Sequence, residues 1–169
     1  MADISSYIEY FRQIATEHKE INGFYMMDIN EILDGLRSTV RYPALILENL
    51  SGSYMASNLD NPLEVINGGF LIIDHLPNPD DFQGEVAIID QMKLIGQQVI
   101  ARMLHDKMKC EPLTEKAIPG FDINTVTFEV VGPLFNNDFG VIMNFRIIDL
   151  VDLFINELLW ENFINGQYL

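Results

Sequence analysis

Asp74, His75, Asp80 and Asp81 are the residues whose types and spacing are best suited to chemistry. Carboxylate oxygens that converge on one point can bind a hard cation, and a histidine beside a carboxylate can transfer protons. Asp80 and Asp81 also stand just before a predicted helix, where acidic residues are expected as caps. We favour this structural interpretation, and we keep a metal or acid–base site on the four residues as an alternative.

The rest of the chain carries no pattern typical of catalysis. The sequence contains no glycine-rich phosphate loop, nucleophile elbow or metalloprotease helix pair. Cys110 is the single cysteine, so the chain cannot form an internal disulfide or a thiolate-rich metal site. We expect it to be passive, because thiolates are favoured at helix N-termini and Cys110 follows a predicted helix. The sequence therefore predicts no catalytic, cofactor-binding or metal-binding residue.

Composition and charge limit the class of protein. The 169 residues are 49% hydrophobic, which is enough for one core, so we predict a single domain over residues 1–169. The net charge of −15 disfavours unaided binding to nucleic acid or to an anionic membrane. No apolar run is long enough to cross a bilayer, and the first residues lack the pattern of a secretory signal. We expect a cytoplasmic protein.

Residues 85–109 carry the strongest structural signal. Their apolar residues recur at helical spacing and form one stripe, made by Ile88, Met92, Ile95, Val99 and Met103. Such a stripe must be buried against a sheet or other helices, because an isolated helix is marginal in water. The segments on either side must supply that cover.

The N-terminal half predicts a helix, a short strand and two longer strands. We expect a helix over residues 3–19, a short strand over 24–27, a turn or short helix after Asp28, and strands over 42–48 and 69–75. Residues 51–69 are rich in Ser, Asn and Gly, and predict a long functional loop between the two strands. The two strands would form a long-looped hairpin.

The C-terminal half predicts a second hairpin and a last helix. Residues 110–123 contain two prolines and a glycine and predict a surface loop. Apolar and polar residues alternate over 124–132 and 141–148, as in two half-buried strands. Residues 149–169 predict a C-terminal helical extension. The predicted fold is α+β, with an antiparallel sheet of about four strands and the order helix, hairpin, helix, hairpin, helix.

The order and texture of these elements resemble the tail terminator and tail-completion proteins of phages. The resemblance covers residues 1–148: RYPALILE (41–48), a long loop, GFLIIDH (69–75), the central helix, TFEVVGPLF (127–135) and a strand over 141–148. It implies a non-enzymatic, virion-associated protein that forms a homo-oligomeric ring at the end of a tail tube. The ring would contact tube subunits on one side and head-proximal proteins on the other.

Two other classes of function remain open. One is an enzyme or small-molecule binder that uses the region of Asp74, His75, Asp80 and Asp81. The other is a bacterial adaptor domain that binds a partner peptide by strand addition to a sheet edge. A bound metal would favour the enzyme, whereas a ring mass that depends on protein concentration would favour the assembly protein.

Overall fold

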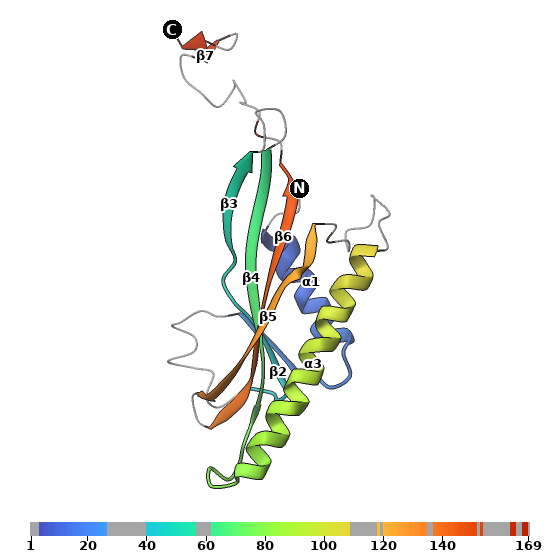
Figure 1. Cartoon of the computed structure of the whole chain (residues 1–169), viewed down its shortest axis with the longest axis vertical. Coiled ribbons are helices and arrows are strands. Elements are labelled where there is room, and N and C mark those ends of the chain that lie inside the picture. Colours follow the sequence, from blue (N-terminus) through green and yellow to red (C-terminus); the bar gives the residue numbers. More distant parts are fainter. Residues whose placement is uncertain are drawn as a thin grey trace.

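Six strands form one mixed sheet, and the helices cover one of its faces (Figure 1). The computed structural model describes residues 4–26, 40–56, 62–108, 118, 120–134, 137–151, 153, 163–164 and 167–168. Within these residues the helices are α1 (Ile4–Glu17) and α3 (Phe82–Met108). The strands of the sheet are β1 (Gly23–Met26), β2 (Ala44–Leu47), β3 (Ser51–Ala56), β4 (Pro62–His75), β5 (Phe121–Leu134) and β6 (Asp138–Leu150). The predicted α+β class is confirmed.

Strand β4 organises the sheet. The strand order is β1-β2-β4-β6-β5, and β3 also pairs with β4. One end of β4 pairs with β3 over residues 62–67, and the other pairs with β2 over residues 70–73. Its opposite edge pairs with β6 over residues 63–75. All of these pairs are antiparallel, whereas β1 is parallel to β2.

Helix α3 is the predicted core helix. Met92, Ile95, Val99 and Met103 are fully buried, as their spacing predicts. The helix begins at Phe82 because Asp81 caps it, with Oδ1 accepting a hydrogen bond of 2.9 Å from the Gly84 N–H. The helix approaches the sheet closely at Gly96, where an added Cβ would lie 2.5 Å from Cε of Met143 in β6.

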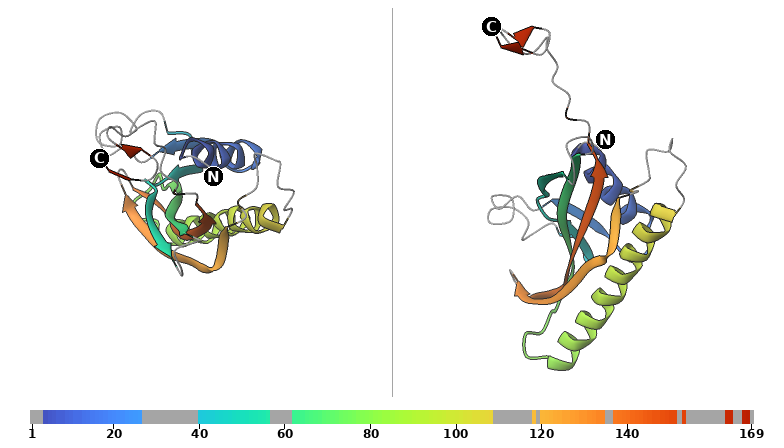
Figure 2. Two further views of the ribbon diagram at one scale, coloured as in Figure 1. Left: turned by 90° about the horizontal axis from the view of Figure 1, so that it is seen from above. Right: turned by 45° about the horizontal axis from the view of Figure 1, so that its top comes forward.

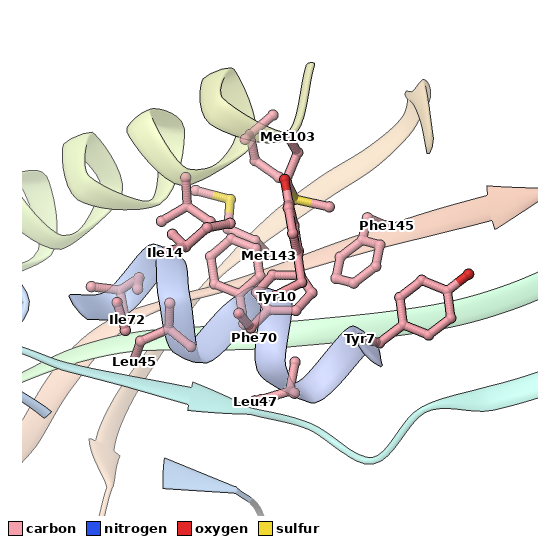
Figure 3. Packing of buried hydrophobic residues seen from close by; sticks show 14 of the residues in the cluster. Tyr7, Tyr10, Ile14, Leu45, Leu47, Phe70, Ile72, Met103, Met143 and Phe145 are labelled. Atoms are coloured by element: carbon pink, nitrogen blue, oxygen red, sulfur yellow. The ribbon is translucent and has the colours of Figure 1, made fainter. Parts of the chain in front are cut away.

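Aromatic side chains join α1 to the centre of the sheet (Figure 3). Phe11 is fully buried, with its ring centroid 5.7 Å from that of Phe70 in β4 and 5.4 Å from that of Phe145 in β6. Aromatic pairs at such separations stabilise a core beyond the burial of their area. The predicted N-terminal helix is therefore confirmed, and it lies on the same face of the sheet as α3.

The predicted loop over residues 51–69 is wrong. Residues 51–56 form β3, and residues 62–69 belong to β4. The loop prediction failed because Gly68 and Gly69 stand within a strand, where the lack of a side chain lets neighbouring residues pack closely. A Cβ at Gly68 would lie 2.7 Å from the side chains of Leu50 and Phe145. The predicted hairpin of β2 and β4 is also not a simple one, because β3 lies between them in the sequence and pairs with β4.

The second hairpin is confirmed, with β5 and β6 longer than predicted. The prediction that β5 is half-buried is wrong, because Phe128 and Val130 are 49% and 56% exposed. Residues 121–123 belong to β5 rather than to a loop. The predicted C-terminal helix is wrong at both of its ends. Residues 149–150 continue β6, because Leu150 and Asp149 pair with Leu63 and Glu64. Near the C-terminus, β7 (Phe163–Ile164) and β8 (Gln167–Tyr168) pair antiparallel on either side of Asn-Gly, a dipeptide that favours hairpin turns.

Some predictions fall outside the described residues, namely the helix after Asp28, most of the loop over 110–123 and residues 154–162 of the last helix. Neither of the two described helices is long and apolar enough to cross a membrane.

Candidate functional site

The four residues of the alternative metal or acid–base site have different local roles in the structure. Asp80 and Asp81 are turn and cap residues: the Asp80 N–H donates to Oδ1 of Asn78 at 3.2 Å, and Asp81 caps α3. His75 ends β4, where its N–H donates to Oδ1 of Asp74 at 2.7 Å. Burial raises the pKa of Asp74, although this hydrogen bond opposes the shift. The structural interpretation therefore holds for Asp80 and Asp81.

His75 instead meets two residues that the sequence did not indicate. Nδ1 of His75 lies 2.9 Å from Oδ1 of Asp138, its cross-strand neighbour at the start of β6. The Tyr42 hydroxyl donates to Oδ2 of the same carboxylate at 2.7 Å. Asp138 is only 2% exposed, and each of its two carboxylate oxygens has a hydrogen-bond partner, as a buried polar group requires. The three residues come from the segment before β2, the end of β4 and the start of β6.

This network orients His75 through its contact with Asp138. An imidazole that donates through Nδ1 keeps Nε2 as an acceptor, the arrangement of a histidine held by a carboxylate in a general base. Burial, followed by the hydrogen bond to Asp138, raises the pKa of Tyr42, which therefore stays protonated at neutral pH. Among the described residues, no group of three or more His, Cys, Asp and Glu side chains could hold a metal ion. The network links three segments at one end of the sheet.

A second buried network joins the two helices. Oδ2 of Asp106 in α3 accepts hydrogen bonds from the Tyr10 hydroxyl of α1 at 3.1 Å and from Nε of Arg102 at 2.7 Å. Nη1 of Arg102 also bonds Oε2 of Glu17 at the end of α1, at 2.7 Å. The spacing of Arg102 and Asp106 on one helix is typical of an ion pair, but no sequence signal indicates Tyr10. The network is structural, since it holds α1 against α3.

Strand β3 is exposed to solvent along its whole length. All six residues of β3 are exposed, and Tyr54 and Met55 retain 63% and 55% of their accessible surface. In Figure 1, β3 lies at the opposite end of the sheet from the start of α3. At the same end Leu150 of β6 is 65% exposed. We call β3, residues 62–67 of β4 and residues 146–150 of β6 the β3 wing.

No protein-family model matches the chain, and no curated protein matches it in sequence.

Proposed function

We propose that this chain is a non-enzymatic assembly protein whose subunits associate through the β3 wing. The observation that carries the proposal is β3 itself, a strand with no buried residue on either face. A strand gains most of its stability from packing one face against a core, and β3 lacks that contribution. A partner that covers the wing would supply it.

The edges of the sheet favour the same conclusion. In the described part of the chain β3 pairs only with β4, so its other edge offers N–H and C=O groups to another strand. The exposed aromatic ring of Tyr54 and the flexible side chain of Met55 are residue types enriched in protein interfaces. Strand addition between subunits would bury both.

The narrower proposal is a phage-type tail terminator that forms a ring on the tail tube. Its support is the resemblance over residues 1–148, without the long loop of residues 51–69, where the structure has β3 and the first part of β4. A ring of subunits with a net charge of −15 each would also repel DNA from its channel wall. The tube subunits and head-proximal proteins would be its partners.

The mass of the protein in solution tests the proposal. Light scattering over a range of protein concentrations should show a closed multimer, and electron microscopy should show a ring. The double variant Tyr54→Ser and Met55→Ser should shift the protein toward monomer, because it removes apolar contact area. Leu94→Ser is the matched control, since Leu94 is 55% exposed but lies on α3. A parent protein that stays monomeric at every concentration would contradict the proposal.

A second candidate is a small-molecule site or enzyme centred on His75, favoured by the contact of 2.9 Å with Asp138. Calorimetric titration with divalent metal ions, and a screen for hydrolase activity, test this candidate. Asp138→Asn should abolish any such activity, because it changes the carboxylate that His75 contacts. Asp80→Asn should leave it unchanged, because the hydrogen bond of Asp80 to Asn78 uses the backbone N–H, which the substitution keeps. Equal loss in both variants would count against a site on His75.

A further inference from the structure

One flank of α3 carries an apolar stripe that lies outside the core. Phe82, Val86, Ile89 and Lys93 are separated by four, three and four positions, so they share one side of the helix. Lys93 shows where this side points, because its Nζ lies 4.5 Å from the ring centroid of Phe128 in β5. In the last turn of the helix, Lys107 lies on the same flank, and its Nζ donates to the Phe121 carbonyl of β5 at 2.6 Å. The flank therefore faces β5.

Strand β5 covers only part of this flank. At the C-terminal half of α3, Ile100 and Leu104 pack into the core beside β5. Further along, β5 bends away from the N-terminal half of α3 (Figure 2). Its pairing with β6 is irregular at two places, between residues 122 and 127 and between 131 and 134, and such irregularities bend a strand.

The bend leaves large apolar side chains exposed on both elements. Phe82 and Val86 of α3 are 72% and 43% exposed, and Phe128 and Val130 of β5 are 49% and 56% exposed. Ile89 is half-buried between them along the stripe. We call these five residues the α3–β5 face. Several large exposed apolar side chains on two neighbouring elements mark a contact site rather than ordinary surface.

The charge around the face selects the kind of partner. Residues 80–93 contain four acidic side chains, Asp80, Asp81, Glu85 and Asp90, and one basic side chain, Lys93. A second copy of the chain would bring the same acidic residues against this cluster, and each copy already carries a net charge of −15. A partner with basic residues beside its apolar ones would meet complementary charge.

From these observations we infer that the α3–β5 face binds a positively charged amphipathic segment of another protein. Its apolar side chains cover Phe82, Val86, Phe128 and Val130. Its lysine or arginine side chains pair with the acidic residues at the start of α3. The start of α3 lies at the opposite end of the sheet from β3 (Figure 1), so the α3–β5 face is distinct from the subunit contact proposed above.

Binding of labelled model peptides tests the inference. Three probes of about five helical turns (~18 residues) are compared by fluorescence anisotropy at near-physiological salt. The first is an amphipathic peptide of leucine and lysine, the second replaces lysine by glutamate, and the third replaces leucine by serine. Only the leucine–lysine peptide should bind saturably, because it alone combines apolar area with positive charge. Equal binding of the leucine–glutamate or the lysine–serine peptide would overturn the inference.

Substitutions in the α3–β5 face test whether the leucine–lysine peptide binds there. Val86→Ser with Val130→Thr should weaken binding of the leucine–lysine peptide by about tenfold or more, since it removes apolar contact area without changing charge. Leu94→Ser should leave the affinity unchanged, because Leu94 is similarly exposed but lies on another side of α3. Circular dichroism checks the fold, and if the double variant unfolds, the single Val86→Ser decides. An equal loss of peptide affinity in the Leu94→Ser control would refute the α3–β5 face as the binding site.

The same variants separate this inference from the proposed function. If Val86→Ser with Val130→Thr removes self-association instead of peptide binding, a second copy occupies the face and the inference fails. Self-association would then stand, but through this face rather than through the β3 wing. If the parent chain is monomeric yet binds the leucine–lysine peptide through these residues, the assembly proposal fails and the inference stands.

Discussion

The hydroxyl of Tyr10 in α1 donates a hydrogen bond of 3.1 Å to Oδ2 of Asp106 in α3. Asp106 is 6% exposed, and Nε of Arg102 donates to the same oxygen at 2.7 Å. A buried carboxylate is costly unless partners replace its water. Because the two residues are 96 positions apart, this contact fixes how the helices pack against each other.

Removing this carboxylate should destabilise the protein. We expect Asp106→Ala to lower the free energy of unfolding by about 2–4 kcal/mol, since Tyr10 and Arg102 both lose a buried acceptor. Glu17→Ala should cost less than about 1 kcal/mol, because its ion pair with Arg102 is exposed to solvent. Urea denaturation measures both values. Equal losses would show that the buried acceptor contributes nothing beyond a surface ion pair.

Two adjacent residues of α3, one buried and one exposed, test which side of the helix faces the core. Ile95→Ala should cost roughly 2–4 kcal/mol, because it removes buried apolar atoms and leaves a cavity. Leu94→Ala should change stability by less than about 0.5 kcal/mol, since Leu94 is 55% exposed whereas Ile95 is fully buried. Chemical denaturation of both variants provides the comparison. A cost below about 0.5 kcal/mol for Ile95→Ala would mean that the helix packs with another face inward.

Two glycines in strands should respond differently to a methyl group. In Gly140→Ala the new Cβ would lie 2.0 Å from the Ile72 carbonyl oxygen, and we expect a loss of about 2 kcal/mol or more. In Gly52→Ala the nearest atom is the Val65 carbonyl oxygen at 3.7 Å, an ordinary contact. This change should be neutral or stabilising by up to about 1 kcal/mol, because it lowers the entropy of the unfolded chain. Thermal unfolding of the two variants checks the order.

Stability should fall at alkaline pH because of Tyr7. Burial, aided by the charges of Asp149 and Glu64, raises the pKa of Tyr7 from 10.0 to about 12 in the folded protein. The folded state therefore holds the phenolic proton more tightly than the unfolded state. The stabilisation is complete below about pH 10 and is lost as the pH rises toward about 12.

Urea denaturation on both sides of pH 10 measures this loss. Tyr7→Phe should show a smaller decrease in stability above pH 10 than the parent. Tyr54→Phe should follow the parent, because Tyr54 is 63% exposed. The same slope in all three proteins would show that Tyr7 is not responsible.

Salt should promote self-association of the assembly protein proposed here. Fifteen net negative charges on each subunit repel one another when subunits meet, and salt screens this repulsion over about 8–10 Å at near-physiological ionic strength. Light scattering at about 50 mM and about 500 mM salt should show a shift from monomer toward a closed multimer. A larger multimer at the lower salt concentration would indicate that ion pairs, rather than apolar contacts, hold the subunits together.

The candidate site shows where sequence reasoning stops. Asp80 and Asp81 were correctly favoured as turn and cap residues, because capping depends only on neighbours in the chain. The partner of His75 was missed because Asp138 lies 63 positions away and meets it only through the register of β4 and β6. The β5–β6 hairpin was predicted, but no local pattern showed that β6 would also pair along the length of β4.

Local periodicity in the sequence alone determined the two described helices, the β5–β6 hairpin and the α+β class, because backbone geometry imposes those repeats on residues close in the chain. Tertiary structure decided the rest. Residues 51–56 and 62–69 have the composition of a loop, yet they are strands because β4 and β6 offer them backbone partners and leave room only for glycine at residue 68. Tertiary structure also left Phe128 and Val130 exposed, because β5 bends away from the N-terminal half of α3. The alternation of apolar and polar residues predicts a half-buried strand but cannot show where that strand bends.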